Sequence, residues 1–243
     1  MSKIIFENIN TVFLDVGNTL ISIDFVWICT ELRKLEIQCD AGQLQKAEAS
    51  ARPVISKRIQ EFKGRKGLEA HVLYLELIFS KLPEKMVHEK IQIIQIVEKL
   101  VPILYPDGNV LRLWSYVLPG VREALQKLKE MNLKIVAVSN GDGTVEAQLT
   151  DQNLISYFDT VIDSHAVGVS KPDPKIFEYA LRVSRTAPER TLFVGDIYSV
   201  DIVGAWSAGL SAILLDPYGD WPDVDCERIT DLLSLCSKIA TSR

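Results

Sequence analysis

The chain has 243 residues, of which 47% are hydrophobic and 24% are charged, and its formal net charge is −5. This acidic balance argues against a nucleic-acid binder or a binder of anionic membranes, because both need a broad basic surface. No apolar run approaches the roughly 18 residues of a membrane span, and the N-terminus lacks a signal-peptide pattern. The four cysteines form no metal-binding or redox pair, so we expect free thiols in a cytoplasmic protein.

A short buried strand is expected at residues 12–14, and it ends on Asp15. Its β-branched and aromatic residues suit a sheet that is covered on both faces. A tight polar turn follows through Gly17, Asn18 and Thr19. In open α/β sheets ligands bind outside the carboxyl ends of the strands, which makes Asp15 a candidate nucleophile or metal ligand. The alternative is an aspartate that only caps a turn or a helix.

Residues 22–113 show helical periodicity almost throughout. Apolar residues recur on one face in four segments, which are 25–35, 44–62, 68–79 and 87–101. Pro53 should kink or split the second helix, and Pro83 should open the fourth. Four helices of this kind can form a small bundle by themselves.

Helix and strand patterns alternate in the rest of the chain. Strands are expected at 134–138, 160–162, 191–194 and 212–215. Helices are expected at 121–131, 144–152, 174–183, 199–208 and 229–239. Such alternation indicates an α/β fold, with a Rossmann-like parallel sheet and helices on both faces. We therefore expect a core domain of residues 1–21 and 114–243, with an all-helical cap domain of residues 22–113 inserted after the first strand.

Each expected strand ends on a polar residue or runs straight into one. These residues are Asp15, Ser139, Asp163, Asp196 and Asp216. One rim of the sheet therefore collects carboxylates and a hydroxyl group. The helical insertion leaves the core at the same rim, so it can fold over that rim as a lid.

Four groups of residues, taken in chain order, resemble the motifs of the haloacid dehalogenase-like hydrolase superfamily. They are Asp15 with Thr19, Ser139 with Asn140, Lys171 before a proline, and Asp196 with Asp201. The resemblance covers essentially the whole chain, and the helical insertion resembles the family's helical cap type. Each group alone also reads as a turn, a loop lysine, a helix cap or a surface charge, but together at strand ends they favour one site.

The resemblance implies a Mg²⁺-dependent phosphatase that acts on a small phosphorylated metabolite, as a monomer or a homodimer. Phosphoryl transfer needs a nucleophile, in-line positioning and neutralisation of charge. Asp15 would be the nucleophile, and Lys171 would offset charge in the transition state. The implied metal site comprises Asp15, the Gly17 carbonyl, Asp196 and, through a water molecule, Asp201. The implied substrate contacts are Asn18, Thr19, Ser139 and Asn140.

Gly17 departs from the family pattern, because the family's phosphatases carry a second aspartate at this position. That aspartate protonates the leaving group, and general acid–base catalysis is worth about 10²–10⁴-fold in rate. We expect slow hydrolysis of alkyl phosphates and a smaller penalty on acyl and aryl phosphates. The alternatives are a phosphonate- or halide-cleaving hydrolase, or a nearly inactive member that binds a phosphorylated ligand or a protein partner. Phosphonate cleavage would need a cap lysine, for which the candidates are Lys34, Lys46, Lys57, Lys63 and Lys66.

Residues 57–66 hold five basic residues and one acidic residue, although the protein as a whole is acidic. The simpler interpretation is a solvated helix end followed by a loop. The alternative is a basic segment that steers an anionic substrate toward the site. In that case, alanine at Lys63, Arg65 and Lys66 would raise KM.

Overall fold

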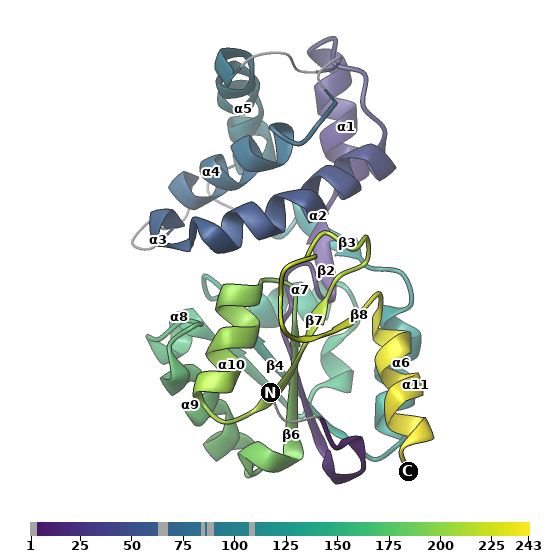
Figure 1. The fold of residues 1–243 in the computed structure, drawn as a ribbon. Coiled ribbons are helices and arrows are strands. Elements are labelled where there is room, and N and C mark those ends of the chain that lie inside the picture. The colour runs from purple at the N-terminus through teal and green to yellow at the C-terminus, as the bar shows by residue number, and fades with distance from the viewer. Residues whose placement is uncertain (1–3, 63–67, 84–85, 87–89, 107–109) are drawn as a thin grey trace. The chain divides into compact units, whose positions relative to one another are not determined.

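The computed structural model describes residues 4–62, 68–83, 86, 90–106 and 110–243 (Figure 1). They divide into two compact units. Residues 1–22 and 117–243 form the unit that we call the α/β unit, and residues 23–116 form the helical unit. The chain passes between them within two short strands that pair with each other, β2 (Ile21–Ile23) and β3 (Trp114–Val117).

The described residues of the α/β unit form a six-stranded parallel sheet with the order β5-β4-β1-β6-β7-β8. The strands are β1 (Thr11–Leu14), β4 (Lys134–Ser139), β5 (Thr160–Asp163), β6 (Thr191–Gly195), β7 (Ser211–Leu215) and β8 (Glu227–Ile229). Every residue of β1 is buried, and Leu14 pairs with Ala137 on one side and with Val194 on the other. The expected Rossmann-like parallel sheet is therefore confirmed, and the carboxyl ends of β4, β1 and β6 lie side by side.

Helices cover both faces of this sheet (Figure 1). They are α6 (Val121–Glu130), α7 (Val145–Asp151), α8 (Ser164–Val167), α9 (Pro174–Ser184), α10 (Val203–Ser207) and α11 (Leu232–Thr241). Asp173 caps the start of α9 by accepting the N–H of Lys175. Because Pro174 needs no hydrogen bond for its nitrogen, α9 has a well-defined start just after Lys171 and Pro172.

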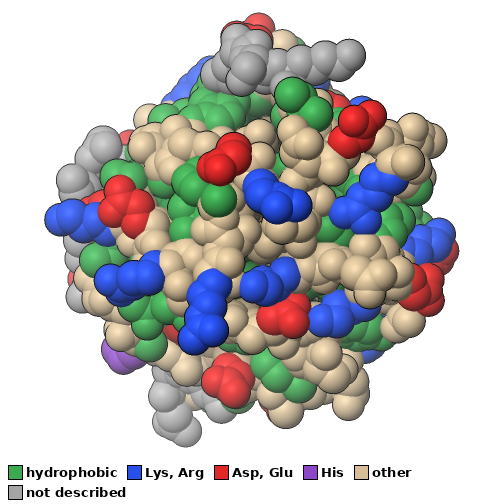
Figure 2. Space-filling model, turned by 90° about the horizontal axis from the view of Figure 1, so that it is seen from below, with side chains coloured by type: hydrophobic (Ala, Val, Ile, Leu, Met, Phe, Trp, Pro, Cys, Tyr) green, Lys and Arg blue, Asp and Glu red, His purple; other side chains and the backbone are tan. Residues whose placement is uncertain are grey.

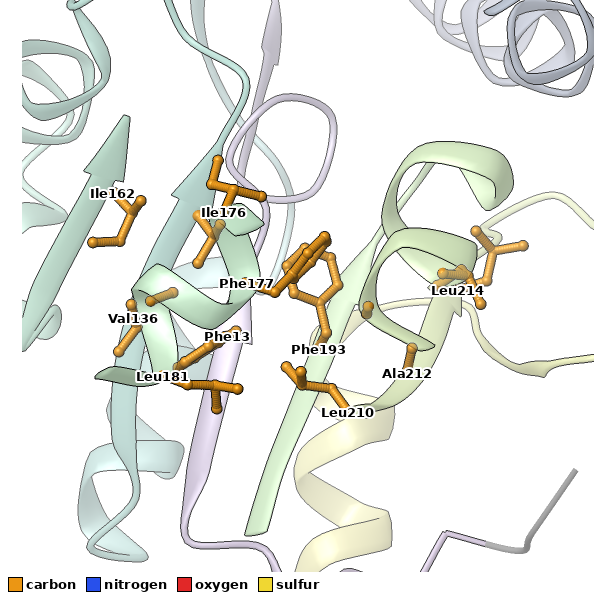
Figure 3. Close-up of a cluster of buried hydrophobic side chains, with 14 of the residues drawn as sticks. Phe13, Val136, Ile162, Ile176, Phe177, Leu181, Phe193, Leu210, Ala212 and Leu214 are labelled. Atoms are coloured by element: carbon orange, nitrogen blue, oxygen red, sulfur yellow. The ribbon is translucent and has the colours of Figure 1, made fainter. Parts of the chain in front are cut away.

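One hydrophobic cluster joins three central strands to α9 (Figure 3). Phe13, Val136 and Phe193 come from β1, β4 and β6, and they pack with Ile176 and Phe177 of α9. The rings of Phe177 and Phe193 meet edge to face, with their centroids 5.2 Å apart. Burial of each large side chain stabilises the fold by about 1.5–3 kcal/mol. This packing therefore fixes the strand ends relative to the start of α9.

Two helix predictions in this unit are wrong in their details. Residues 199–208 begin with a π-helical turn, Tyr198–Ile202, before α10 starts. Ile229 belongs to strand β8 instead of a helix, and α11 begins three residues later at Leu232. The reason is local, because Asp231 accepts the N–H of Ser234 and caps α11 at that point.

The helical unit contains helices in all four segments where periodicity predicted them. They are α1 (Phe25–Lys34), α2 (Ala41–Lys57), α3 (Ile59–Phe62), α4 (Leu68–Phe79) and α5 (Lys90–Leu104). Pro53 does not split the second helix, because α2 continues past it and ends at Lys57, with Arg58 as its C-cap. Ala51 and Ile55 of α2 are buried, and this burial offsets the hydrogen bond that the proline removes. The start of the fourth helix after Pro83 lies largely outside the described residues.

Basic side chains are dispersed on the face of the molecule that Figure 2 presents. Lysine and arginine side chains are separated there by acidic, hydrophobic and other groups. In the α/β unit, Lys129 Nζ lies 3.2 Å from Asp159 Oδ2. Separately, no helix within the described ranges is both long enough and apolar enough to cross a membrane.

Candidate active site

Three buried carboxylates meet at the carboxyl edge of the sheet. Asp15 follows β1, Asp196 follows β6, and Asp201 lies in the π-helical turn, with exposed fractions of 6%, 3% and 1%. The Asp15 N–H donates to the Val194 carbonyl at 2.9 Å, which extends the sheet pairing to the site. One candidate ligand oxygen from each carboxylate lies within 4.8 Å of the others. The structure thus brings together residues that are far apart in the sequence.

Lys171 joins two of these carboxylates. Its Nζ lies 2.5 Å from Asp15 Oδ1 and 2.7 Å from Asp201 Oδ1, and its side chain is 2% exposed. Burial alone would lower the pKa of Lys171, but the two carboxylates outweigh burial and raise it, so the amine stays protonated. Burial raises the pKa of Asp15 to about 6, although Lys171 pulls it down. Lys171 is therefore a fixed positive charge beside Asp15.

Asp201 braces the loop that follows β6. Its Oδ2 accepts the main-chain N–H groups of Asp196 at 3.1 Å and Ile197 at 2.9 Å, while its Oδ1 binds Lys171. At Gly195 a Cβ atom would lie only 2.4 Å from Asp201 Cγ. A glycine is therefore needed at the end of β6 for this carboxylate to approach the main chain.

The turn after Asp15 is tightly organised. Asn18 adopts a positive φ of 53°, and its Oδ1 accepts a hydrogen bond from Ser22 Oγ at 2.6 Å. The Asn18 N–H donates to the Ile21 carbonyl at 2.7 Å. Thr19 Oγ1 is buried and has no hydrogen-bond partner among the described residues. A buried hydroxyl of this kind costs free energy unless a ligand or water molecule binds it.

The second predicted motif lies at the end of β4, the strand next to β1. Ser139 is buried there, and the Asn140 side chain hydrogen-bonds to the main chain of Lys171. The loop beyond Asn140 is held by Asp163, whose Oδ2 accepts the N–H groups of Gly143 and Val145. The sequence placed Asp163 at this rim but did not reveal its role in the loop. Its position at a strand end, one strand away from Ser139, was the available signal.

The structure describes some of the lysine and arginine residues that were singled out in the helical segment, but not all of them. Lys63, Arg65 and Lys66 lie outside the described residues, so Lys57 and Arg58 are the basic residues of this segment that the structure describes. Arg58 pairs at the surface with Glu61, with 2.5 Å between the charged atoms. Lys34 pairs with Glu31 and is 65% exposed. The Arg58–Glu61 pair is that of solvated surface residues, whereas Lys34 reaches from solvent to a largely buried Glu31.

The donor set fits a hard divalent cation. Mg²⁺ prefers oxygen ligands, and three buried carboxylates supply them here. Lys171 pairs with two of these carboxylates, Asp15 and Asp201, and a divalent cation would add further positive charge at the same buried site. Asp15 and Asp196 are the residues that could hold it, together with the main-chain carbonyl of Gly17.

Comparisons with known proteins show the family to which the sequence is similar. A family model described as haloacid dehalogenase-like hydrolase matches residues 9–209. The haloacid dehalogenase-like hydrolase domain-containing protein 3 of Bos taurus is 29% identical over 204 residues, which cover 83% of this chain and 79% of that protein. A glyceraldehyde 3-phosphate phosphatase of Methanothermobacter thermautotrophicus is 37% identical over 99 residues, which cover 40% of this chain and 44% of that protein.

A solved structure shows the same fold. The HAD-hydrolase YfnB from Bacillus subtilis, bound to magnesium, aligns with a TM-score of 0.61 and 20% sequence identity. The alignment covers 95% of this chain and 98% of that one. At this identity the similarity concerns the fold alone.

Proposed function

Because the chain belongs to the haloacid dehalogenase-like hydrolase family, and is therefore a hydrolase, we propose that it cleaves phosphate monoesters of small metabolites with Mg²⁺ as cofactor. The observation that carries the proposal is the buried cluster of Asp15, Asp196 and Asp201 around Lys171. A relative named as a phosphatase supports it. The match to that relative spans less than half of either chain, so the substrate class is part of the proposal.

Asp15 is the nucleophile in this proposal. One of its carboxylate oxygens attacks phosphorus, and the bond from phosphorus to the ester oxygen breaks with its electron pair on the leaving oxygen. Water then attacks phosphorus in the aspartyl-phosphate, which releases inorganic phosphate and restores the Asp15 carboxylate. Lys171 stabilises the negative charge that develops on the phosphoryl oxygens, because its ammonium group is already fixed 2.5 Å from Asp15 Oδ1.

Asp15, Asp196 and the Gly17 carbonyl would hold the cation. When bound, Mg²⁺ reduces the repulsion between a dianionic phosphate and the Asp15 carboxylate. Asp201 keeps Asp196 in place through the N–H bond at 3.1 Å. Each carboxylate oxygen has more than one acceptor site, so Asp201 also retains the capacity to bind a metal-held water molecule.

Four residues near Asp15 are the proposed substrate contacts. Ser139 Oγ and the main-chain N–H of Asn140 would bind phosphate oxygens at the end of β4. Thr19 is supported as a contact by its buried hydroxyl, which lacks a partner among the described residues. Asn18 is the fourth proposed contact, and its side chain also stabilises the turn by accepting a hydrogen bond from Ser22.

The helical unit would act as the family's helical cap and select the metabolite. This role for the residues expected as the cap, 22–113, is part of the proposal.

Two other functions remain as competing candidates. Halide cleavage needs no divalent cation, so the buried triad of carboxylates argues against it. Gly17 is the only feature of the site that favours a nearly inactive binding protein, because Asp15, Lys171, Asp196 and Asp201 are all present.

The direct test is hydrolysis of an aryl phosphate by the purified protein with Mg²⁺ and with excess EDTA. We expect turnover that requires Mg²⁺ and a loss of at least about 10³-fold in the Asp15→Asn variant, because the nucleophile is removed. Chloride release from a 2-haloacid should stay at background. Metal-independent chloride release, or turnover by D15N at the wild-type rate, would overturn the proposal.

A further inference from the structure

We propose that Asn140 is a positioning residue whose side chain holds the main chain of Lys171, so that the lysine ammonium group reaches Asp15. Asn140 Oδ1 accepts the main-chain N–H of Lys171 at 2.8 Å, and Asn140 Nδ2 donates to the Lys171 carbonyl at 2.9 Å. One side chain therefore binds both main-chain polar groups of the same residue. The kinetic consequence rests on the proposed function, whereas the geometry does not.

Lys171 lies in a loop that needs such support. Residues 168–173 connect α8 to α9 without regular secondary structure. Among the described residues, neither the N–H nor the carbonyl group of Lys171 makes a hydrogen bond to another main-chain group. The next residue, Pro172, has no N–H that could donate one. Lys171 is 4% exposed, so unpaired polar groups on its main chain would be costly.

The two bonds also define which substitution is informative. Turning the amide over would set donor against donor and acceptor against acceptor, so the pairing fixes its orientation. Aspartate has nearly the same shape but offers only acceptors. Asn140→Asp therefore retains the bond from the Lys171 N–H and loses the bond to the Lys171 carbonyl.

The loop that carries Asn140 is anchored from the neighbouring strand. Asp163, the last residue of β5, accepts the N–H of Gly143 at 3.0 Å and that of Val145 at 3.3 Å. At Gly141 a Cβ atom would lie 2.7 Å from Asp163 Oδ2, so the loop main chain packs directly on this carboxylate. Asn140 therefore belongs to a loop that is held by several hydrogen bonds, and it can fix the position of the loop of residues 168–173.

A displaced Lys171 would affect the chemical step. Its Nζ lies 2.5 Å from Asp15 Oδ1 and 2.7 Å from Asp201 Oδ1, and a misplacement of about 1 Å can cost about 10²-fold in rate. We expect Asn140→Ala and Asn140→Asp to lower kcat for an aryl phosphate by about 10- to 100-fold. KM should change much less, because the lysine acts mainly on charge in the transition state.

The first experiment measures amide hydrogen exchange at Lys171 by NMR. We expect exchange to accelerate by at least about tenfold in N140A, because the N–H loses its acceptor. The matched control is Asp142→Ala, in the same loop, where the carboxylate accepts the N–H of Thr144 instead. D142A should leave exchange at Lys171 and the kinetics unchanged. Wild-type exchange at Lys171 in N140A would overturn the proposal, whereas N140D should keep exchange close to wild type because it retains this acceptor.

The second experiment is a double-mutant cycle with Lys171→Ala, in variants that unfold like the wild type. N140A should slow the wild-type enzyme but have little further effect in K171A. Equal slowing in both backgrounds would show that the Asn140 side chain acts on the substrate itself, which contradicts the proposal. If N140A does not fold, Asn140→Leu, which has a similar size and no polar side-chain atoms, serves in both experiments. If the wild type hydrolyses no phosphate ester, the proposed function fails, whereas exchange at Lys171 still decides the role of Asn140.

Discussion

Individual site residues differ in how far the sequence can reveal them. Asp15 and Asp196 follow buried strands directly, so an apolar run that ends on a carboxylate indicates each of them locally. The side-chain role of Asn140 could not be found in this way. Its partner Lys171 is 31 positions later, and the two meet only when both loops are folded. The role of a residue that acts through contacts between loops can be recognised only in the three-dimensional structure.

The absence of a side chain at Gly17 leads to a prediction about general acid catalysis. Gly17 is partly exposed and does not have the positive φ that favours glycine, so its backbone accepts other residues. We expect Gly17→Asp to accelerate alkyl-phosphate hydrolysis by about 10²-fold, the lower range for a general acid. Aryl phosphates should gain much less, because their leaving groups need little protonation.

The matched control for this substitution is Gly17→Asn, which has the same size but no exchangeable acid proton at neutral pH. Steady-state kinetics on one alkyl and one aryl phosphate would measure both variants. A G17D enzyme no faster than G17N, with metal binding intact, would mean that another group already protonates the leaving oxygen.

Short elements were the ones that sequence periodicity missed. Strand β8, Glu227–Ile229, has three residues and is defined as a strand by its pairing with β7. Such a run is too short to show a period of two, so Ile229 resembled the start of the following helix. Long elements such as α9 were predicted nearly to their ends, because amphipathic spacing and the Asp173-Pro174 start signal agree.

The cap of α11 is a testable part of this account. Asp231 Oδ1 accepts the Ser234 N–H at 2.7 Å and its hydroxyl at 3.0 Å. We expect Asp231→Ala to lower the free energy of unfolding by about 1 kcal/mol at pH 7, whereas exposed Asp223→Ala should change it little. Urea unfolding monitored by circular dichroism measures both.

The pH dependence of this cap has a defined sign. Burial would raise the pKa of Asp231, but hydrogen bonds from Ser234 outweigh burial and lower it in the folded state. The stabilisation is therefore complete above the unfolded pKa of about 3.9 and is lost as the pH falls through the lower folded value. The difference between wild type and D231A should shrink below about pH 4. A difference that grows in acid would contradict the capping role.

At the scale of the molecule, the change from helical periodicity to alternation predicted a parallel sheet, and the structure confirms it. The points where the chain changes unit were less visible, because they fall inside β2 and β3. Residues 24–113 separate these two short strands in the sequence, and no local pattern encodes such a pairing.

The α/β unit should fold without the helical unit. The Leu118 N–H donates to the Leu20 carbonyl at 2.9 Å, so the two chain segments of this unit are already adjacent where they meet. We expect a chain with a short Gly-Ser linker in place of residues 23–116 to unfold cooperatively and to bind Mg²⁺ in calorimetry. The same chain with Asp196→Asn should bind it much more weakly. Failure of the shortened chain to fold would show that the units are interdependent.

The most direct test of the central claim is to trap the covalent intermediate. The wild-type protein would be mixed with an aryl phosphate and Mg²⁺, quenched in acid within the first turnover, digested and examined by mass spectrometry. The account predicts one added phosphoryl group on the peptide that contains Asp15, and none when Mg²⁺ is removed or in D15N. A phosphoryl group on another residue, or continued hydrolysis by D15N at the wild-type rate, would contradict it.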